Sequence, residues 1–315
     1  MTRDAQQIAR VAIVFPGQGA QKAGMAKDFH EAFGVARETF EEASDATGLD
    51  MRTLCFEDKE RLGLTEFAQP AILTAEIAML VSLRAEYGIE PVVYGGHSLG
   101  EYTALVATGV LPVGEAAALV RARGRAMQDS VAVGAGGMLA VIKPQLDVAK
   151  VAACLDGLSV DVANINSADQ VVLSGTDADL ATARKRVKEA IERAKCLPLR
   201  VSAPFHSRLM AAAAENFRPT LVRASTGWNG EQAGNVASNY TGAFHTTMPA
   251  EIAESLARQI DAPVKWLDNM RGILGRSDRV IELGPGRPLR GFFSSLGTTI
   301  ECITDTKTAD ATLAS

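Results

Sequence analysis

The hydrophobic positions of this chain form short apolar runs separated by longer helical patterns. The apolar runs Val11–Phe15, Val92–Tyr94 and Val280–Leu283 read as buried strands, and each is followed by glycines. Apolar residues at helical spacing predict helices over Ala32–Ala46, from Pro70 to about Tyr87, over Val113–Asp129 and over Glu251–Ile260. Pro70 suits the first position of its helix, which would leave Gln69 just before it. This alternation of strands and helices predicts an α/β fold.

The middle of the chain follows a different order. Its predicted elements are the strand Met138–Ile142, the helix Gln145–Leu155, the strands Ser159–Ile165 and Gln170–Ser174, the helix Asp177–Arg193 and the strand Cys196–Ser202. That βαββαβ order is typical of a ferredoxin-like unit. We therefore predict a discontinuous large domain over 1–133 and 203–315, interrupted by a small ferredoxin-like domain over 134–202. From Thr304 onward the chain is polar, and we expect a frayed end there.

The sequence Gly96-His97-Ser98-Leu99-Gly100 lies between a predicted strand and a helical pattern. The spacing G-x-S-x-G in that context indicates a nucleophile elbow, a sharp turn that exposes a serine hydroxyl. Only glycine fits where the neighbouring backbone passes very close. The helix that follows would direct free N–H groups and its positive dipole end toward an oxyanion. The alternative is an ordinary glycine-rich turn between a strand and a helix.

A serine nucleophile needs a base, and neutral imidazole is the usual one near pH 7. The chain has four histidines: His30, His97, His206 and His245. His97 is adjacent to Ser98, and adjacent side chains on a tight turn diverge. His206 lies at the junction of the two predicted domains, where we expect a cleft, so it is the best candidate. The alternative for His206 is a structural histidine with satisfied hydrogen bonds.

Arg123 lies on the apolar stripe of its predicted helix, four residues after Leu119 and four before Met127. A charge on an inward face is costly unless it meets an anion. One explanation is an internal salt bridge to an aspartate or glutamate. The other is a guanidinium that binds a substrate carboxylate. The spacing alone leaves both open.

Composition narrows the class of protein. The 315 residues carry a formal net charge of −5, which argues against a nucleic-acid binder. The four cysteines are far apart and form no C-x-x-C pair, so neither a disulfide framework nor a zinc site is expected, and a reducing cytoplasm is the natural compartment. The apolar run near the N-terminus is too short for a signal peptide, and no apolar run is long enough to span a bilayer.

Several motifs together carry a resemblance to a known family. They are Phe15-Pro16-Gly17-Gln18-Gly19-Ala20-Gln21, Gln69-Pro70-Ala71, Gly96-His97-Ser98-Leu99-Gly100-Glu101, Arg123-Gly124, Pro204-Phe205-His206-Ser207 and Glu282-Leu283-Gly284-Pro285-Gly286. In this order, from about residue 11 to 295, the chain resembles the malonyl-CoA:acyl-carrier-protein transacylases of fatty-acid and polyketide synthesis. The resemblance implies an α/β-hydrolase-like large domain, an inserted ferredoxin-like small domain, and an active site in the cleft between them.

The resemblance also implies roles for individual residues. Ser98 would be the nucleophile, His206 the base and Arg123 the ligand of the malonyl carboxylate. The backbone N–H groups of Gln18 and Leu99 would form the oxyanion hole, and a main-chain carbonyl, which we assign to Gln259, would orient His206. The residues expected to line the substrate site are Gln69, His97, Phe205, Asn164 and Asn166; Phe205 matches the malonyl-selective pattern.

The implied reaction is a ping-pong transfer of malonyl from malonyl-CoA to the phosphopantetheine thiol of an acyl carrier protein, with no bound cofactor and no metal. We expect a monomer without nucleic-acid or membrane partners. The basic run Arg184, Lys185 and Arg186 is a candidate contact for an acidic carrier protein. The alternatives are an acyltransferase that serves a polyketide synthase in trans, a hydrolase that strips carrier proteins, and an inactive carrier-docking module.

Overall fold

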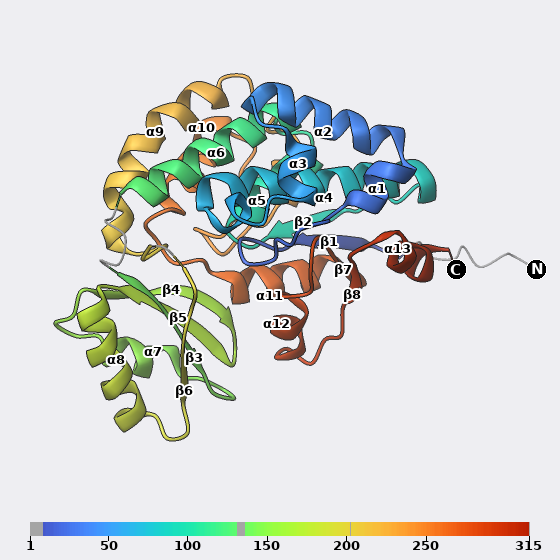
Figure 1. Cartoon of the computed structure of the whole chain (residues 1–315). Coiled ribbons are helices and arrows are strands. Elements are labelled where there is room, and N and C mark those ends of the chain that lie inside the picture. The colour runs from blue at the N-terminus through green and yellow to red at the C-terminus, as the bar shows by residue number, and fades with distance from the viewer. Residues whose placement is uncertain (1–8, 131–135, 202, 315) are drawn as a thin grey trace, which may run out of the picture.

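The computed structural model describes residues 9–130, 136–201 and 203–314, and it contains two four-stranded sheets (Figure 1). The first sheet is parallel and has the order β2-β1-β7-β8. Its strands are β1 (Val11–Phe15), β2 (Val93–Gly96), β7 (Arg279–Leu283) and β8 (Glu301–Ile303). The predicted α/β fold is therefore confirmed, and β8 is a strand that the pattern of apolar residues did not predict.

Helices cover both faces of the parallel sheet (Figure 1). On one face lie α1 (Lys27–Ala32), α2 (Gly34–Thr47), α3 (Met51–Phe56), α4 (Thr65–Tyr87), α5 (Leu99–Ala107), α6 (Val113–Asp129), α9 (Ala211–Ser225) and α10 (Pro249–Arg258). On the other face lie α11 (Trp266–Arg276) and α12 (Arg290–Ser294), and α13 (Thr306–Leu313) follows β8. Three short 3-10 helices, Arg61–Gly63, Arg208–Met210 and Ala233–Asn235, connect these elements.

Helix α4 begins earlier than its proline suggests. Pro70 lies in the second turn of α4 rather than at its first position, so the predicted start was wrong and Gln69 is a buried helical residue. Proline removes one hydrogen bond to the carbonyl of the preceding turn, but α4 packs against α2 and α6, and this packing outweighs the loss. By length and composition α4 could span a membrane, yet 83% of its most apolar window is buried inside the protein.

The C-terminal segment is ordered, which corrects the expectation of a frayed end. The side chain of Asp305 accepts a hydrogen bond from the N–H of Thr308, and the Thr308 hydroxyl oxygen accepts one from the N–H of Asp305. This capping box starts α13. Ala309 is buried and Leu313 packs on the core. Local capping and two apolar contacts therefore suffice to order a mostly polar segment.

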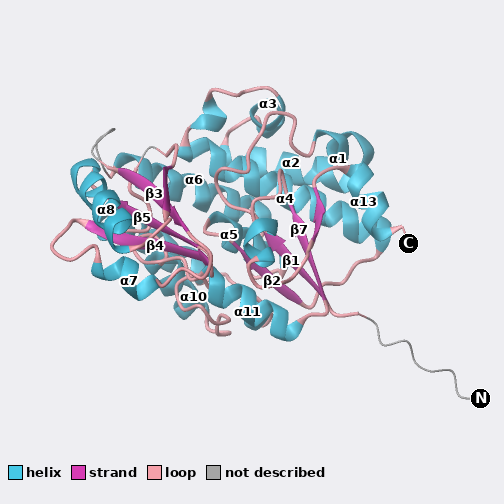
Figure 2. Ribbon diagram, turned by 90° about the horizontal axis from the view of Figure 1, so that it is seen from below, coloured by secondary structure: helices cyan, strands magenta, loops and turns pink. Residues whose placement is uncertain are grey.

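The second sheet forms the small domain (Figure 2). Its elements are β3 (Gly137–Ile142), α7 (Val148–Ala153), β4 (Val160–Ser167), β5 (Gln170–Gly175), α8 (Asp177–Ala190) and β6 (Lys195–Pro198). The strands are antiparallel in the order β4-β5-β3-β6, as in a ferredoxin-like unit. The helices and β6 are shorter than predicted. Residues 133, 134 and 202, at which the domain boundaries are proposed, lie outside those the structure describes.

The small sheet has two different faces. One packs with α7 and α8 around its own core, which includes Leu139, Val141 and Val187. The other adds Met138 and Val172 to the core of the large domain. The edge strand β4 is also tied to the large domain, because the N–H of Ile165 donates to the carbonyl of Val264 at 2.9 Å and the N–H of Val264 to that of Ala163 at 2.9 Å. These contacts fix the two sheets around a shared cleft.

Candidate active site

Ser98 lies on a sharp turn between β2 and α5, with φ 52° and ψ −99°. A Cβ atom on Gly96 would come within 1.9 Å of the Gly100 backbone, and one on Gly100 within 2.3 Å of the Phe15 carbonyl oxygen. Both positions therefore need glycine. The ordinary strand–helix turn left open above does not account for the strained φ and ψ of Ser98, whereas a nucleophile elbow does.

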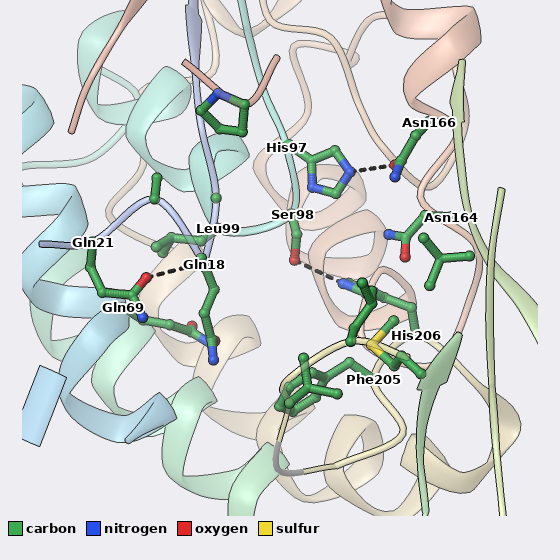
Figure 3. A pocket seen from close by; sticks show the side chains of 18 of the residues that line it. Gln18, Gln21, Gln69, His97, Ser98, Leu99, Asn164, Asn166, Phe205 and His206 are labelled. Atoms are coloured by element: carbon green, nitrogen blue, oxygen red, sulfur yellow. Dashed lines mark hydrogen bonds between the residues drawn. The ribbon is translucent and has the colours of Figure 1, made fainter. Parts of the chain in front are cut away.

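His206 meets the hydroxyl of Ser98. Its Nε2 lies 2.9 Å from Ser98 Oγ (Figure 3). Its Nδ1 lies 2.7 Å from the carbonyl oxygen of Gln259. Because a carbonyl only accepts, Nδ1 carries the proton and Nε2 is left as an acceptor for the serine proton. His206 also has a positive φ, 57°. The two residues thus share a geometry in which backbone strain is concentrated at the reacting groups.

Burial and, to a smaller extent, the nearby Arg123 charge together lower the pKa of His206 to about 3, against the opposing effect of the Gln259 carbonyl. His206 is therefore neutral at pH 7 and available as a base. Burial likewise lowers the pKa of His97. The His97 ring points away from the serine and its Nε2 lies 2.8 Å from Asn166 Oδ1 (Figure 3), as expected for adjacent side chains that diverge.

Arg123 is 1% exposed, and all its hydrogen bonds are to neutral groups. It donates to Gln69 Oε1 at 2.8 Å, to Gln259 Oε1 at 2.7 Å and to Ser98 Oγ at 3.0 Å. Its Nε is buried without a partner, and within the described residues no aspartate or glutamate forms an ion pair with it. The internal salt bridge is thus absent from the described part of the chain. The nearby carboxylate of Glu101 acts on the charge of Arg123 without contacting it, so the guanidinium can still take a carboxylate as a direct partner.

Gln18 and Leu99 lie beside Ser98, on the side away from His206 (Figure 3). Leu99 is the first residue of α5, so its N–H has no acceptor inside the helix. The loop that carries Gln18 passes very close to the elbow, since a Cβ on Gly17 would lie 2.3 Å from the His97 carbonyl oxygen. The side chain of Gln18 donates to Thr65 Oγ1 at 3.1 Å, which directs it away from the serine. The two backbone N–H groups are therefore suitably placed for an oxyanion.

These groups surround a cavity of about 370 Å³. Every residue predicted for the site lines it except Gln259, which lies buried behind it. The predicted residues in the lining are Gln18, Gln69, His97, Ser98, Leu99, Arg123, Asn164, Asn166, Phe205 and His206. Lining residues that the sequence did not suggest include Met127, Met138, Val172, Leu199, Arg200 and Phe292. Besides the groups at the serine, the lining contains apolar side chains and further polar ones, which are Gln21, Asn164, Asn166, Gln170 and Arg200.

Two further contacts fix the elbow and were not predicted. The N–H of Ser98 donates to Asn239 Oδ1 at 2.6 Å, and the Gln259 side chain donates to the Ser98 carbonyl at 3.0 Å. Asn239 lies in a loop with no periodic pattern, so nothing in the sequence indicated it. Gln259 was predicted only for its main-chain carbonyl.

The remaining candidates lie outside the cavity. None of Arg184, Lys185 and Arg186 on α8 lines it, and Arg186 donates to the carbonyls of Cys154 and Asp156. No group of histidine, cysteine, aspartate or glutamate side chains in the described ranges is arranged to hold a metal ion. The site therefore presents a serine, a neutral imidazole and a guanidinium as its chemical groups.

Residues 12–265 match the family model described as the acyl transferase domain. The chain is 35% identical to the malonyl CoA-acyl carrier protein transacylase of Bacillus subtilis (strain 168) over 301 residues, covering 94% of this chain and 93% of that protein. It is 36% identical to the protein of the same name from Escherichia coli (strain K12) over 320 residues, covering 96% of each.

Solved structures give the same result. The acyl-carrier-protein S-malonyltransferase of Burkholderia pseudomallei 1710b superposes with a TM-score of 0.89 at 38% identity, covering 97% of this chain and 100% of that one. A malonyl transacylase in complex with its type II polyketide synthase acyl carrier protein superposes with a TM-score of 0.90 at 34% identity, covering 97% of this chain and 99% of that one.

Proposed function

This chain belongs to the family of malonyl CoA-acyl carrier protein transacylases, and from that premise we propose that it transfers malonyl from malonyl-CoA to the phosphopantetheine thiol of an acyl carrier protein. One observation carries the proposal for the site. Ser98 Oγ lies 2.9 Å from the Nε2 of a neutral histidine and 3.0 Å from a buried arginine that has no carboxylate partner among the described residues. A nucleophile and an anion-binding group thus share one corner of the cavity.

In the first half-reaction, Ser98 Oγ attacks the thioester carbonyl carbon of malonyl-CoA while His206 Nε2 takes the hydroxyl proton. The C=O electron pair moves onto oxygen, where the N–H groups of Gln18 and Leu99 receive the negative charge; one such donor is worth about 3 kcal/mol. When the intermediate collapses, the C–S bond breaks and His206 returns the proton to the leaving CoA thiolate. The product is a malonyl ester on Ser98.

Arg123 selects the acyl group. A malonyl ester on Ser98 carries a free carboxylate, and a guanidinium binds a carboxylate through two parallel hydrogen bonds. An acetyl group offers no such partner and would leave the cation buried and unpaired, which is costly. A carboxylate on Arg123 also offsets the charge that contributes to the low pKa of His206. Binding of the correct substrate therefore weakens one cause of the low pKa of His206, while burial, the larger cause, remains.

In the second half-reaction, the thiol of the carrier arm attacks the ester carbonyl, and His206 takes the thiol proton. The C–O bond breaks, the proton passes to Ser98 Oγ, and malonyl leaves as a thioester of the carrier. Water could replace the thiol, so transfer depends on the arm filling the cavity. The apolar side chains of Met138, Val172 and Leu199 in the lining favour the apolar parts of the arm over water, and the polar lining residues can meet its amide groups.

We propose that no metal or redox cofactor takes part. His206 accepts and returns each proton, and backbone N–H groups stabilise the negative charge of the intermediate. We place the enzyme in the cytoplasm. All four cysteines are free thiols, which fits a reducing compartment, and the proposed reaction needs a CoA thioester and a carrier protein in the same space.

The decisive experiment offers a holo acyl carrier protein to enzyme that has been incubated with malonyl-CoA and freed of excess substrate. We expect malonyl-carrier to form, with the enzyme returning to its unmodified mass. Apo carrier, which lacks the arm, is the matched control and should not unload the enzyme. Release of free malonate at the same rate with either carrier would indicate a hydrolase, and no loading at all would indicate a docking module. Carriers from fatty-acid and polyketide systems, compared in the same assay, separate the two pathways.

A further inference from the structure

A buried carboxylate lies directly behind the candidate active site. Glu101 on α5 is 0% exposed and accepts three hydrogen bonds. Its Oε1 lies 2.7 Å from His245 Nε2, and its Oε2 accepts from the Gln259 side chain at 2.6 Å and from the N–H of Asn239 at 3.0 Å. The side chain of His245 is itself only 1% exposed. A buried carboxylate needs this degree of pairing, so each of these contacts helps to hold Glu101 in place.

The carboxylate of Glu101 decides which way the side-chain amide of Gln259 faces. The NH₂ group of that amide donates to Glu101 Oε2 and to the Ser98 carbonyl, and its oxygen accepts from Arg123 at 2.7 Å. A flipped amide would set its oxygen against two acceptors and its NH₂ against a guanidinium that only donates. Glu101 on one side and Arg123 on the other therefore permit a single orientation.

Gln259 in turn touches three of the groups expected to react or bind. Its side-chain oxygen holds Arg123, its side-chain NH₂ holds the Ser98 carbonyl, and its main-chain carbonyl accepts from His206 Nδ1 at 2.7 Å. The side-chain contacts depend on Glu101, whereas the main-chain contact is set by the end of α10. If Glu101 moves, the position of Arg123 should therefore change more than the position of His206.

His245 completes this arrangement from a loop of the large domain. It contacts the carboxylate oxygen that Gln259 and Asn239 leave free, so without it Glu101 Oε1 would lose its hydrogen-bond donor. An unpaired buried carboxylate oxygen is costly, and the side chain would turn or draw in water to satisfy it. Either change releases the restraint on the Gln259 amide.

We propose that His245 is a positioning residue for malonyl recognition: it fixes Glu101, which fixes the Gln259 amide, which aims Arg123 at the substrate carboxylate. The inference rests on the proposed function, and it adds to it a residue that never touches the substrate. Because Arg123 binds the carboxylate in the ground state and the transition state alike, loss of its aim weakens binding more than it slows the chemical step.

The test is single-turnover loading of Ser98 as a function of malonyl-CoA concentration. For His245→Ala we expect the half-saturating concentration to rise about ten-fold while the limiting loading rate stays within about two-fold of wild type. His245→Gln, whose amide can still donate to Glu101, should restore the wild-type value. His245→Asn is the matched control, since its amide is one methylene too short to reach, and it should behave like His245→Ala. It also serves if the alanine variant does not fold.

A double-variant comparison excludes a merely structural role. In an Arg123→Ala background, His245→Ala should leave the half-saturating concentration unchanged, because the group it positions has been removed. If His245→Ala raises the half-saturating concentration equally in the wild-type and Arg123→Ala backgrounds, the proposal is wrong. It is also wrong if folded His245→Ala and His245→Asn keep the wild-type half-saturating concentration. In either case a wild-type chain that loads malonyl normally leaves the proposed function standing. A wild-type chain that never loads malonyl refutes the proposed function, and this inference with it.

Discussion

The two walls of the cleft are built in different ways. On the large-domain wall, Ser98 and Arg123 each make two hydrogen bonds to buried neighbours, and His206 makes one to the buried Gln259 and one to the half-buried Ser98. On the small-domain wall, Met138 and Val172 are apolar and Leu199 is partly exposed, and the main polar contacts are His97 to Asn166 at 2.8 Å and Asn166 to Gln170 at 2.8 Å. The large-domain wall thus holds its polar groups in a buried hydrogen-bond network, whereas the small-domain wall combines apolar side chains with the polar side chains of Asn164, Asn166, Gln170 and Arg200.

This difference assigns separate tasks to the two domains. Groups that must act together on one carbon atom need fixed relative positions, and these come from a single packed body. The small domain joins that body through β4 and Val264 and supplies contact surface. Changes on the large-domain wall should therefore alter chemistry and acyl selection, whereas changes on the small-domain wall should alter acceptance of the arm.

The largest effect is expected for His206→Ala. Without a base to take the Ser98 proton, the rate of malonyl loading should fall about 10³-fold. Stopped-flow or quenched-flow loading with malonyl-CoA measures it. His30→Ala is the matched control, because His30 packs against Phe40 and Phe56 and does not line the cavity, and it should load normally. If the loading rate of His206→Ala falls by less than ten-fold, the large-domain wall does not supply the base.

Arg123→Ala should reduce the rate of Ser98 loading at low malonyl-CoA concentration about 10²-fold, because a bidentate, charge-assisted contact is lost. Loading from acetyl-CoA should be unchanged or faster, because no buried cation is then left without its partner. Arg125→Ala on the same helix is the control: the Arg125 side chain is 69% exposed and pairs with Asp129. Equal losses with both acyl groups would show that Arg123 supports the fold of this wall and does not select the substrate.

The low pKa of His206 predicts a pH-dependent stability. In the unfolded chain histidine titrates near 6.5, and in the folded chain burial lowers the pKa of His206 to about 3. The unfolded state thus binds more protons below pH 6.5, so the stability that His206 contributes is complete above that pH and is lost as the pH falls toward 3, by at most about 1.4 kcal/mol per pH unit.

Two carboxyl groups oppose this trend. Burial raises the pKa of Glu282 to about 7 and that of Glu76 well above its ordinary value, so both favour the folded state as the pH falls. The contribution of His206 is therefore measured as a difference, by urea unfolding of the wild type and of His206→Gln between pH 7 and 5. The wild type should lose more stability than the variant over this range. Parallel curves would show that His206 is not held neutral by burial.

The smallest effect is expected on the small-domain wall. Asn166→Ala removes the hydrogen bond to His97, which is worth about 1 kcal/mol, so transfer to the carrier should slow about five-fold while the rate of Ser98 loading stays nearly constant. Asn235→Ala is the control, since the Asn235 side chain donates to Gln232 in a short 3-10 helix and does not line the cavity. If the loading rate of Asn166→Ala falls as much as that of His206→Ala, the two walls of the cleft do not have separate tasks.

The sequence identified those parts of the site that obey a local rule. Glycine spacing indicates Ser98, and the scarcity of histidines and a place between domains indicate His206. The apolar helical stripe singles out Arg123 but leaves an internal salt bridge open, and the family resemblance assigns its role. Asn239, His245 and the side-chain role of Gln259 follow no such rule, because their partners lie more than 130 residues away in the chain. Glu101 was visible within the quoted motif, three residues after Ser98 on an otherwise apolar helix, but its partners were not.

For the fold, too, the sequence predicts local patterns and misses what depends on contacts between distant residues. Strands and helices with apolar periodicity appear where the sequence predicts them. Helix α13 was missed because a capping box and two apolar contacts order a polar segment. The start of α4 was misplaced because tertiary packing tolerates Pro70 in its second turn.

The central claim is that one serine carries the acyl group and that a neighbouring cation chooses it. The most direct measurement is peptide mapping by mass spectrometry after brief incubation with an equimolar mixture of malonyl-CoA and acetyl-CoA. We predict a malonyl adduct on the peptide that contains Ser98, little or no acetyl adduct, and neither on Ser98→Ala. An adduct on another residue, or equal labelling of Ser98 by both acyl groups, would contradict the account.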